Sequence, residues 1–220
     1  PREVRAVISQ RLFVDKSELP SALLNAIKRI AAFQNPEFYK KQRMRLSTAM
    51  TPRVITCAED LAKHVALPRG CQAEIEELLR EHGVTLTIED ARYGGQSLQA
   101  EFRGDLTTIQ EQAAQALIQH DIGVFVAPPR VGKTVLGTYM TATRGRNTLV
   151  LVHRGPILDQ WVTHLSIFLG VDEKAIGRIG GGKRRVTGSI DVAMIQSLVR
   201  QGRVDDVVGS YGHVIVDECH

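Results

Sequence analysis

The stretch that decides the fold is Ala127-Pro128-Pro129-Arg130-Val131-Gly132-Lys133-Thr134, which directly follows the apolar run Val124-Phe125-Val126. A Gly-Lys-Thr ending is typical of a loop whose successive main-chain amides point at phosphate oxygens. In such a loop the lysine reaches the outer phosphates, and the threonine hydroxyl holds magnesium. We therefore expect residues 127–134 to bind a nucleotide between a strand at 124–126 and a helix at 133–143.

An acidic motif follows a second apolar run, in the stretch Val214-Ile215-Val216-Asp217-Glu218-Cys219-His220. In phosphoryl transfer, one carboxylate at such a strand end holds magnesium and a neighbour orients the attacking water. We assign Asp217, together with Thr134, to the metal and Glu218 to the water. ATP and Mg²⁺ are therefore the expected cofactors.

The pattern of residues 96–220 predicts an α/β domain with a parallel sheet. Short apolar strands alternate with longer helical stretches, and this favours parallel strands with helices on both faces. Ligands of such sheets bind at the carboxyl ends of the strands, where both motifs fall. The expected strands and helices after residue 143 are 148–152, 156–169, 190–194 and 214–216.

Residues 1–95 predict a small α+β accessory domain. Apolar residues at helical spacing indicate a helix within 19–33, and Asn35-Pro36-Glu37 reads as the start of a second helix. The expected later elements are strands at 53–57, 64–67 and 84–88, a helix at 72–81, and a linker at 93–97.

Charge is unevenly distributed along the chain, whose formal net charge is +4. Residues 1–53 hold 11 Lys/Arg against 4 Asp/Glu. Such a segment suits a polyanion, although a solvated surface would have the same composition. The apolar runs are too short to cross a membrane. Three cysteines without a CxxC pair fit a reducing compartment, so we expect a cytoplasmic protein.

Several motifs resemble those of superfamily 2 helicases, the DEAD/DEAH-box class. Asp217-Glu218-Cys219-His220 resembles motif II, and residues 148–154 with Leu158-Asp159-Gln160-Trp161 are similar to motif Ia. Residues 191–198 are similar to the strand and Ser/Thr motif that precedes motif II. Within the superfamily, the chain most resembles the XPB-like branch, and there the helicase portion of bacterial TOTE conflict-system primase–helicase proteins. Residues 33–40 and 66–71 carry that finer resemblance.

The resemblance implies the ATP-binding half of a DNA helicase or translocase. It implies a RecA-like P-loop fold for 96–220, and a second RecA-like domain in the parent chain that supplies an arginine finger. It implies that Gln110 reads adenine and that His220 couples the nucleotide site to the second domain. Arg154, Gln196 and Ser197 would then contact nucleic acid, DNA rather than RNA, although strand-end residues of these types also cap helices and form turns.

Two basic clusters are further candidates for contact with nucleic acid. One is a predicted flexible loop with Lys183, Arg184 and Arg185, and the other is a predicted helix with the residues Lys40, Lys41, Arg43 and Arg45. Helical spacing would place Lys41 and Arg45 on one face. Trp161 reads as a core residue. Two other functions stay open: a nucleic-acid-binding or sensing module on a passive RecA-like scaffold, and the motor subunit of a restriction system.

Overall fold

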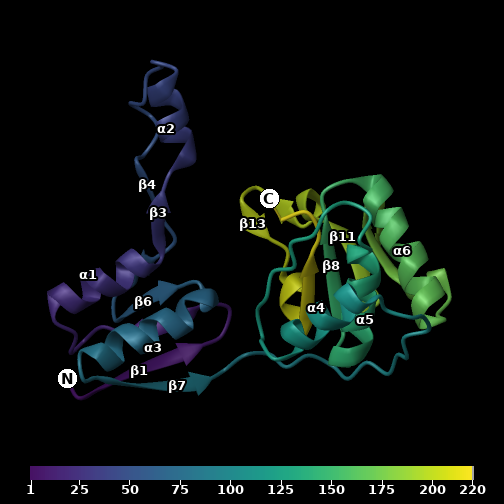
Figure 1. Ribbon diagram of the computed structural model, residues 1–220, viewed down its shortest axis with the longest axis horizontal. Coiled ribbons are helices and arrows are strands. Elements are labelled where there is room, and N and C mark those ends of the chain that lie inside the picture. The colour runs from purple at the N-terminus through teal and green to yellow at the C-terminus, as the bar shows by residue number, and fades with distance from the viewer. Residues whose placement is uncertain (220) are drawn as a thin grey trace. The chain divides into compact units, whose positions relative to one another are not determined.

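The computed structural model describes residues 1–219 and divides the chain into two compact units (Figure 1). The first unit is Pro1–Arg92, and the second begins at Tyr93. Each unit has its own hydrophobic core and is described by itself. No helix within residues 1–219 is long and apolar enough to cross a membrane.

The first unit is an α+β domain built on a five-stranded sheet in the order β5-β6-β2-β1-β7. The strands β1 and β7 are parallel, and the other neighbours are antiparallel. The bounds are β1 Glu3–Ile8, β2 Leu12–Asp15, β5 Glu59–Asp60, β6 His64–Leu67 and β7 Thr85–Asp90. The strands β1 and β2 were not predicted, although Val4, Ala6 and Ile8 alternate with more exposed residues along β1.

Two helices cover this sheet, α1 (Ser21–Ile30) and α3 (Gln72–Glu81), close to their predicted positions. They bury Leu23, Ile27, Ile75 and Leu79 against the inward side chains of β1, β2 and β6. These side chains form the core of the unit. Their burial stabilises it, because removing apolar surface from water is the main favourable term in folding.

An arm extends from the first unit between α1 and β5 (Figure 1). A two-stranded antiparallel ribbon, β3 (Ala32–Gln34) with β4 (Val54–Thr56), carries the helix α2 (Pro36–Arg43). The predicted helix start is confirmed, because the Asn35 side chain accepts a hydrogen bond from the Glu37 amide and Pro36 opens the helix. We call residues 32–56 the α2 arm.

The second unit is an α/β domain with the sheet order β10-β9-β11-β8-β14. The strands β9, β11, β8 and β14 run parallel, and β10 is antiparallel to β9. Their bounds are β8 Thr148–Val152, β9 Gly177–Gly180, β10 Lys183–Arg185, β11 Ile190–Met194 and β14 His213–Val216. The helices are α4 (Thr108–Ile118), α5 (Lys133–Arg144) and α6 (Gly155–Leu169).

The helices α5 and α6 pack on one face of the second sheet, and α4 packs on α5, whereas helices were expected on both faces. On that face α6 buries Trp161 and Leu165 against alternate residues of β8 and β11. The other face is packed by Leu198, which follows the 3₁₀ segment η3 (Ile195–Ser197), by Tyr211 and by the 3₁₀ segment η4 (Asp206–Ser210). Glycines and β-branched valines between β11 and β14 favour turns and the small hairpin of β12 (Val199–Arg200) and β13 (Arg203–Val204) over a helix.

The predicted strand at 124–126 is wrong, because this segment is irregular backbone. Val124 is 72% exposed and Val126 is 87% exposed. The run is only three residues long, and the two prolines that follow it cannot donate to a sheet ladder. The predicted nucleotide loop, residues 127–134, is therefore preceded by irregular chain, and β14 is an edge strand of the sheet.

Candidate functional site

The predicted phosphate loop turns sharply into α5. Gly132 caps the helix in the left-handed region at φ 83°, and Arg130 is also left-handed at φ 71°. A Cβ atom on Gly132 would lie 2.4 Å from Gln110 Nε2. Both the backbone conformation and this close approach therefore favour glycine at 132. The first turn of α5 then carries Lys133 and Thr134 at the positive end of the helix dipole.

Gln110 supports this loop from α4. Its side-chain Nε2 donates to the Val131 carbonyl at 2.8 Å, and its Oε1 accepts from the Thr107 amide at 2.9 Å. The residue is 5% exposed and forms a capping box with Thr107 at the start of α4. The side-chain amide of Gln110 thus faces the loop, and its role in reading adenine stays a prediction.

The phosphate loop and the acidic motif meet at the end of β14. Lys133 Nζ lies 3.3 Å from Glu218 Oε1, and each side chain is one-third exposed. The Asp217 amide donates to the Leu151 carbonyl at 2.9 Å, which continues the pairing of β14 with β8 one residue past the strand. Glu218 then turns away in the left-handed region at φ 55°. Two motifs far apart in sequence thus form one ionic cluster.

Trp161 connects α6 to this cluster. Its indole Nε1 donates to Asp217 Oδ2 at 2.8 Å, while the side chain is 2% exposed. The ring also packs closely on α5, because a Cβ on Gly137 would lie 2.4 Å from Trp161 Cη2. Trp161 is in the core as expected, but sequence reasoning missed its contact with the acidic motif. Its helical spacing with Leu158 and Leu165 gave no sign of that contact.

The residues present fit magnesium bound together with a nucleotide. No cluster of three or more His, Cys, Asp or Glu side chains that could hold a metal ion occurs within residues 1–219. Magnesium in nucleotide sites usually has one or two carboxylates, a hydroxyl, water and substrate phosphates around it. Asp217 offers a carboxylate here, and Thr134 offers a hydroxyl on the first turn of α5.

Three candidates for nucleic-acid contact in the second unit lie at the carboxyl ends of neighbouring strands. Arg154 follows β8 and precedes α6, and Gln196 and Ser197 follow β11. The last residues of these strands are paired, Val152 with Met194. Gln196 Nε2 donates to the His153 carbonyl at 2.9 Å, which joins the two strand ends, while the Arg154 side chain is exposed.

The basic stretch Lys183–Arg185 is a strand, β10, and the predicted flexible loop is therefore wrong. Gly181 and Gly182 form a tight turn that pairs β10 with β9. Arg184 bonds Asp205 at 2.7 Å, and Arg185 donates to the carbonyls of Glu173 and Ile176. Two of the three cations are thus engaged in contacts within the unit.

The other basic cluster lies on the α2 arm. Lys41 pairs with Glu37 at 2.9 Å and donates to Thr51 Oγ1 at 2.7 Å, while Lys40 and Arg43 are exposed. Arg45 lies beyond the end of α2 at φ 53°, so the predicted shared helical face with Lys41 is wrong. The remaining predicted site residue, His220, lies outside the described residues.

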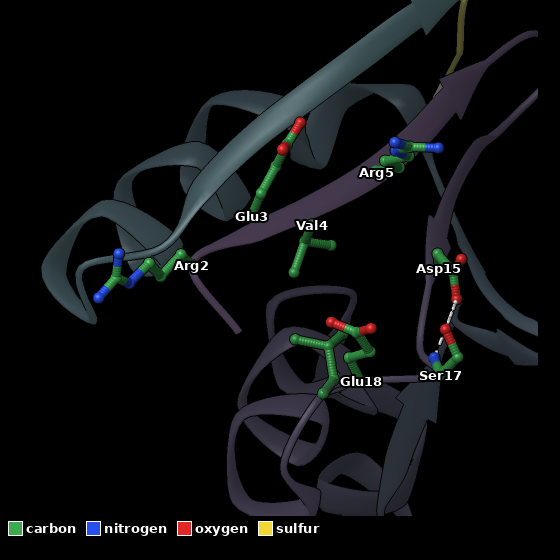
Figure 2. Close-up of a pocket in the computed structure, with 8 residues that line it drawn as sticks. Arg2, Glu3, Val4, Arg5, Asp15, Ser17 and Glu18 are labelled. Atoms are coloured by element: carbon green, nitrogen blue, oxygen red, sulfur yellow. Dashed lines mark hydrogen bonds between the residues drawn. The ribbon is translucent and has the colours of Figure 1, made fainter.

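One hollow of the first unit contains none of the predicted site residues (Figure 2). It is lined by both acids and bases, Arg2, Glu3, Arg5, Asp15 and Glu18 among them. Asp15 accepts hydrogen bonds there from the Ser17 hydroxyl at 2.6 Å and the Ser17 amide at 2.9 Å, which lower its pKa. These bonds form a local turn, which accounts for the Asp15 carboxylate at this position without any bound ligand.

Known proteins share both the sequence and the fold. Two putative DNA 3'-5' helicases called Rad25 are similar over 150 residues, or 67% of this chain. The relative from Haloarcula marismortui is 27% identical and that from Halobacterium salinarum 28%. This chain spans 24% and 25%, respectively, of their lengths.

Two structures of the UvsW helicase from bacteriophage T4 share the fold across 99% of this chain. Their TM-scores are 0.69 and 0.70, with 13% and 14% sequence identity. The match covers 83% of one solved chain and 47% of the other. The expected RecA-like α/β fold after a smaller α+β unit is confirmed.

Sequence comparison also places the second unit in a family. The model of the family described as "Type III restriction enzyme, res subunit" matches residues 103–220. This range includes the phosphate loop, Trp161 and the acidic motif, and it is more than half of the chain. The chain therefore belongs to the type III restriction enzyme res-subunit family, and its resemblance to superfamily 2 helicases is confirmed at that level.

Proposed function

We propose that this chain is the ATP-binding half of an ATP-dependent superfamily 2 DNA helicase or translocase. The observation that supports this most directly is the ion pair of Lys133 with Glu218, together with the Trp161–Asp217 hydrogen bond. These contacts bring the proposed phosphate, water and metal residues to one strand end. Such a site couples nucleotide hydrolysis to movement between two RecA-like domains.

Each residue of the cluster has a role that its chemistry allows. The amides of 130–134 and the Lys133 ammonium would bind the nucleotide phosphates. Asp217 and the Thr134 hydroxyl would hold Mg²⁺, which neutralises charge on the phosphate oxygens when bound. Glu218 would orient the attacking water. Lys133 would exchange its present partner, Glu218, for a phosphate when the nucleotide binds.

The second RecA-like domain and the nucleic acid are proposed partners. The chain spans about a quarter of the curated relatives it matches, so the arginine finger would come from a part of the parent protein outside residues 1–220. Nucleic acid would pass over Arg154, Gln196 and Ser197 at the strand ends, and over Lys183, which pairs with the last residue of β9 at the same end of the sheet. We also propose a position in the XPB-like branch close to the TOTE-type proteins, and a cytoplasmic location in accord with free cysteines at 57, 71 and 219.

A restriction-system motor is the second candidate function, since the family description names a restriction-enzyme subunit. It would use the same ATP chemistry and differ only in its associated subunits. A passive scaffold, by contrast, would leave nucleic-acid affinity independent of nucleotide.

Affinity for labelled DNA in the presence of different nucleotides separates a motor from a scaffold. We expect the dissociation constant to differ severalfold between Mg²⁺ with a non-hydrolysable ATP analogue and Mg²⁺ with ADP, because the site links both ligands. The Lys133→Ala variant should show the same affinity in both conditions. Equal affinities in the unsubstituted chain would favour the binding module on a passive scaffold.

A further inference from the structure

The excess positive charge of the chain is concentrated in the α2 arm. Residues 32–56 contain five Lys/Arg and one Asp/Glu, while the other residues contain 23 of each. The arm therefore accounts for the whole net charge of +4. A segment of one sign on an otherwise balanced chain attracts polyanions.

The arm is held together by polar contacts and has no apolar core. Its two buried residues are Asn35 and Thr51. Asn35 Nδ2 donates to the Pro52 carbonyl at 2.8 Å, and Thr51 accepts from Lys41. These contacts close the loop after α2 onto the start of the helix. The arm thus keeps a defined shape without burying its large apolar side chains.

Several apolar side chains of the arm are instead exposed. Three of them lie between α2 and β4: Met44 at 59%, Leu46 at 54% and Met50 at 95% exposure. Exposed apolar side chains gathered on one small element mark an interaction surface. Met44 and Leu46 alternate with Arg43 and Arg45 in the sequence, so apolar and cationic groups occupy the same short segment.

We propose that this tip, Met44, Leu46 and Met50, packs against accessible bases of a nucleic acid, while Lys40, Arg43 and Arg45 neutralise the flanking phosphates. Apolar side chains next to cations match a ligand whose charged backbone carries apolar ring faces. Bases are accessible where the duplex is interrupted, so the arm would prefer a fork to a continuous duplex. The proposal rests on the proposed function only for its choice of nucleic acid as partner.

The proposed role of the α2 arm can be tested by measuring DNA affinity at several salt concentrations. The two ligands are a labelled fork and a continuous duplex of equal length. The unsubstituted chain should bind the fork about tenfold more tightly, since the apolar side chains of the tip bury surface against an unpaired base but not against a closed duplex. A tip variant, Met44→Gln with Leu46→Gln and Met50→Gln, should lose this preference and keep its salt dependence. Ile167→Gln, which changes an exposed residue of α6, is the matched control and should keep both.

A variant that removes positive charges provides the second part of the test. Lys40→Gln with Arg43→Gln and Arg45→Gln should weaken binding to both DNAs, and its log–log salt slope should fall by about 0.7–0.9 for each lost phosphate contact. Equal binding of fork and duplex by the unsubstituted chain, or an unchanged preference in the tip variant, would overturn the proposal. An unchanged slope in the charge variant would also overturn it and favour an acidic protein as partner.

Two further measurements keep these outcomes interpretable. Thermal unfolding of both variants should match that of the unsubstituted chain, because every substituted side chain is exposed. Mg²⁺–ATP binding should also be unchanged in both. Loss of fork preference with intact ATP binding would therefore be an effect of the α2 arm alone. Failure of the unsubstituted chain to bind ATP would instead contradict the proposed function.

Discussion

The indole nitrogen of Trp161 donates a 2.8 Å hydrogen bond to the carboxylate of Asp217, and the two residues are 56 positions apart in the sequence. The contact links the first half of α6 to the acidic motif after β14. The ring is also held from the other side by α5 at Gly137. A rigid donor of this kind fixes one rotamer of the carboxylate, as outer-shell partners of metal ligands commonly do.

Trp161→Phe should therefore weaken Mg²⁺-dependent nucleotide binding by about 10–100-fold, because Asp217 loses its orienting donor. Binding measured calorimetrically without Mg²⁺ should change little. Leu165→Met, a volume-conserving change in the same core, is the control and should retain the Mg²⁺ effect. Equal loss of affinity with and without Mg²⁺ would assign Trp161 a purely structural role.

Glu218→Gln should keep Mg²⁺–ATP binding and lose hydrolysis, because the amide cannot accept a proton from water. The unsubstituted chain itself should turn over slowly, since a supplied arginine is worth about 10³–10⁵ in rate. Phosphate release with and without DNA measures both effects. Rapid DNA-stimulated turnover by residues 1–220 alone would contradict the requirement for a second domain.

A buried asparagine fixes the start of the second sheet. Asn147 accepts from the amides of Gln96 and Gly212 and donates to the carbonyls of Gly188 and Ser210, all within 2.8–3.0 Å. Asn147→Ala should lower the free energy of unfolding by about 3 kcal/mol, because four backbone groups lose a hydrogen-bond partner whose own side chain is buried. Denaturant unfolding measures this, with the exposed Asn25→Ala as the control. A loss equal to that of the control would show that water replaces these bonds.

Acid should destabilise the second unit through His213. Burial, and then the charge of Arg144, lower the pKa of this ring from 6.5 to about 4. Between these values the unfolded chain binds more protons, so stability falls as the pH falls from about 6.5 to about 4. At pH 5 the loss should be about 2 kcal/mol. His213→Gln should reduce the difference in stability between pH 7 and pH 5, whereas His120→Gln, at an exposed position, should not. The same pH dependence in both variants would contradict the burial argument.

The sequence predicted those parts of the fold whose signal is local. Strands β8 and β14 each contain a continuous apolar run, β11 is apolar except for Asp191, and α2 has a cap, a proline and an acid in order. The strand β1, which was not predicted, also has a local signal in the alternation of Val4, Ala6 and Ile8. The segment 124–126 shows the opposite case, because a three-residue apolar run specifies no partner strand.

The site was predictable in outline but not in its contacts. Spacing and residue type singled out Gly132, Lys133 and Asp217 as candidates, and their roles stay predictions. The Trp161–Asp217 and Gln110–Val131 hydrogen bonds depend on how helices cross the sheet, which no local pattern records. The partners of Arg184 and Arg185 likewise depend on the β9–β10 pairing. Composition alone therefore overstated how free these two side chains are to contact nucleic acid.

The central claim is that residues 127–134 and the acidic motif form one nucleotide site, and calorimetric titration of Mg²⁺–ATP tests it most directly. The unsubstituted chain should bind ATP, and Lys133→Ala should abolish that binding because the ammonium beside the phosphates is lost. Lys174→Ala, an exposed lysine of the same unit, should bind as the unsubstituted chain does. Unchanged binding by Lys133→Ala would contradict the assignment of the phosphate loop.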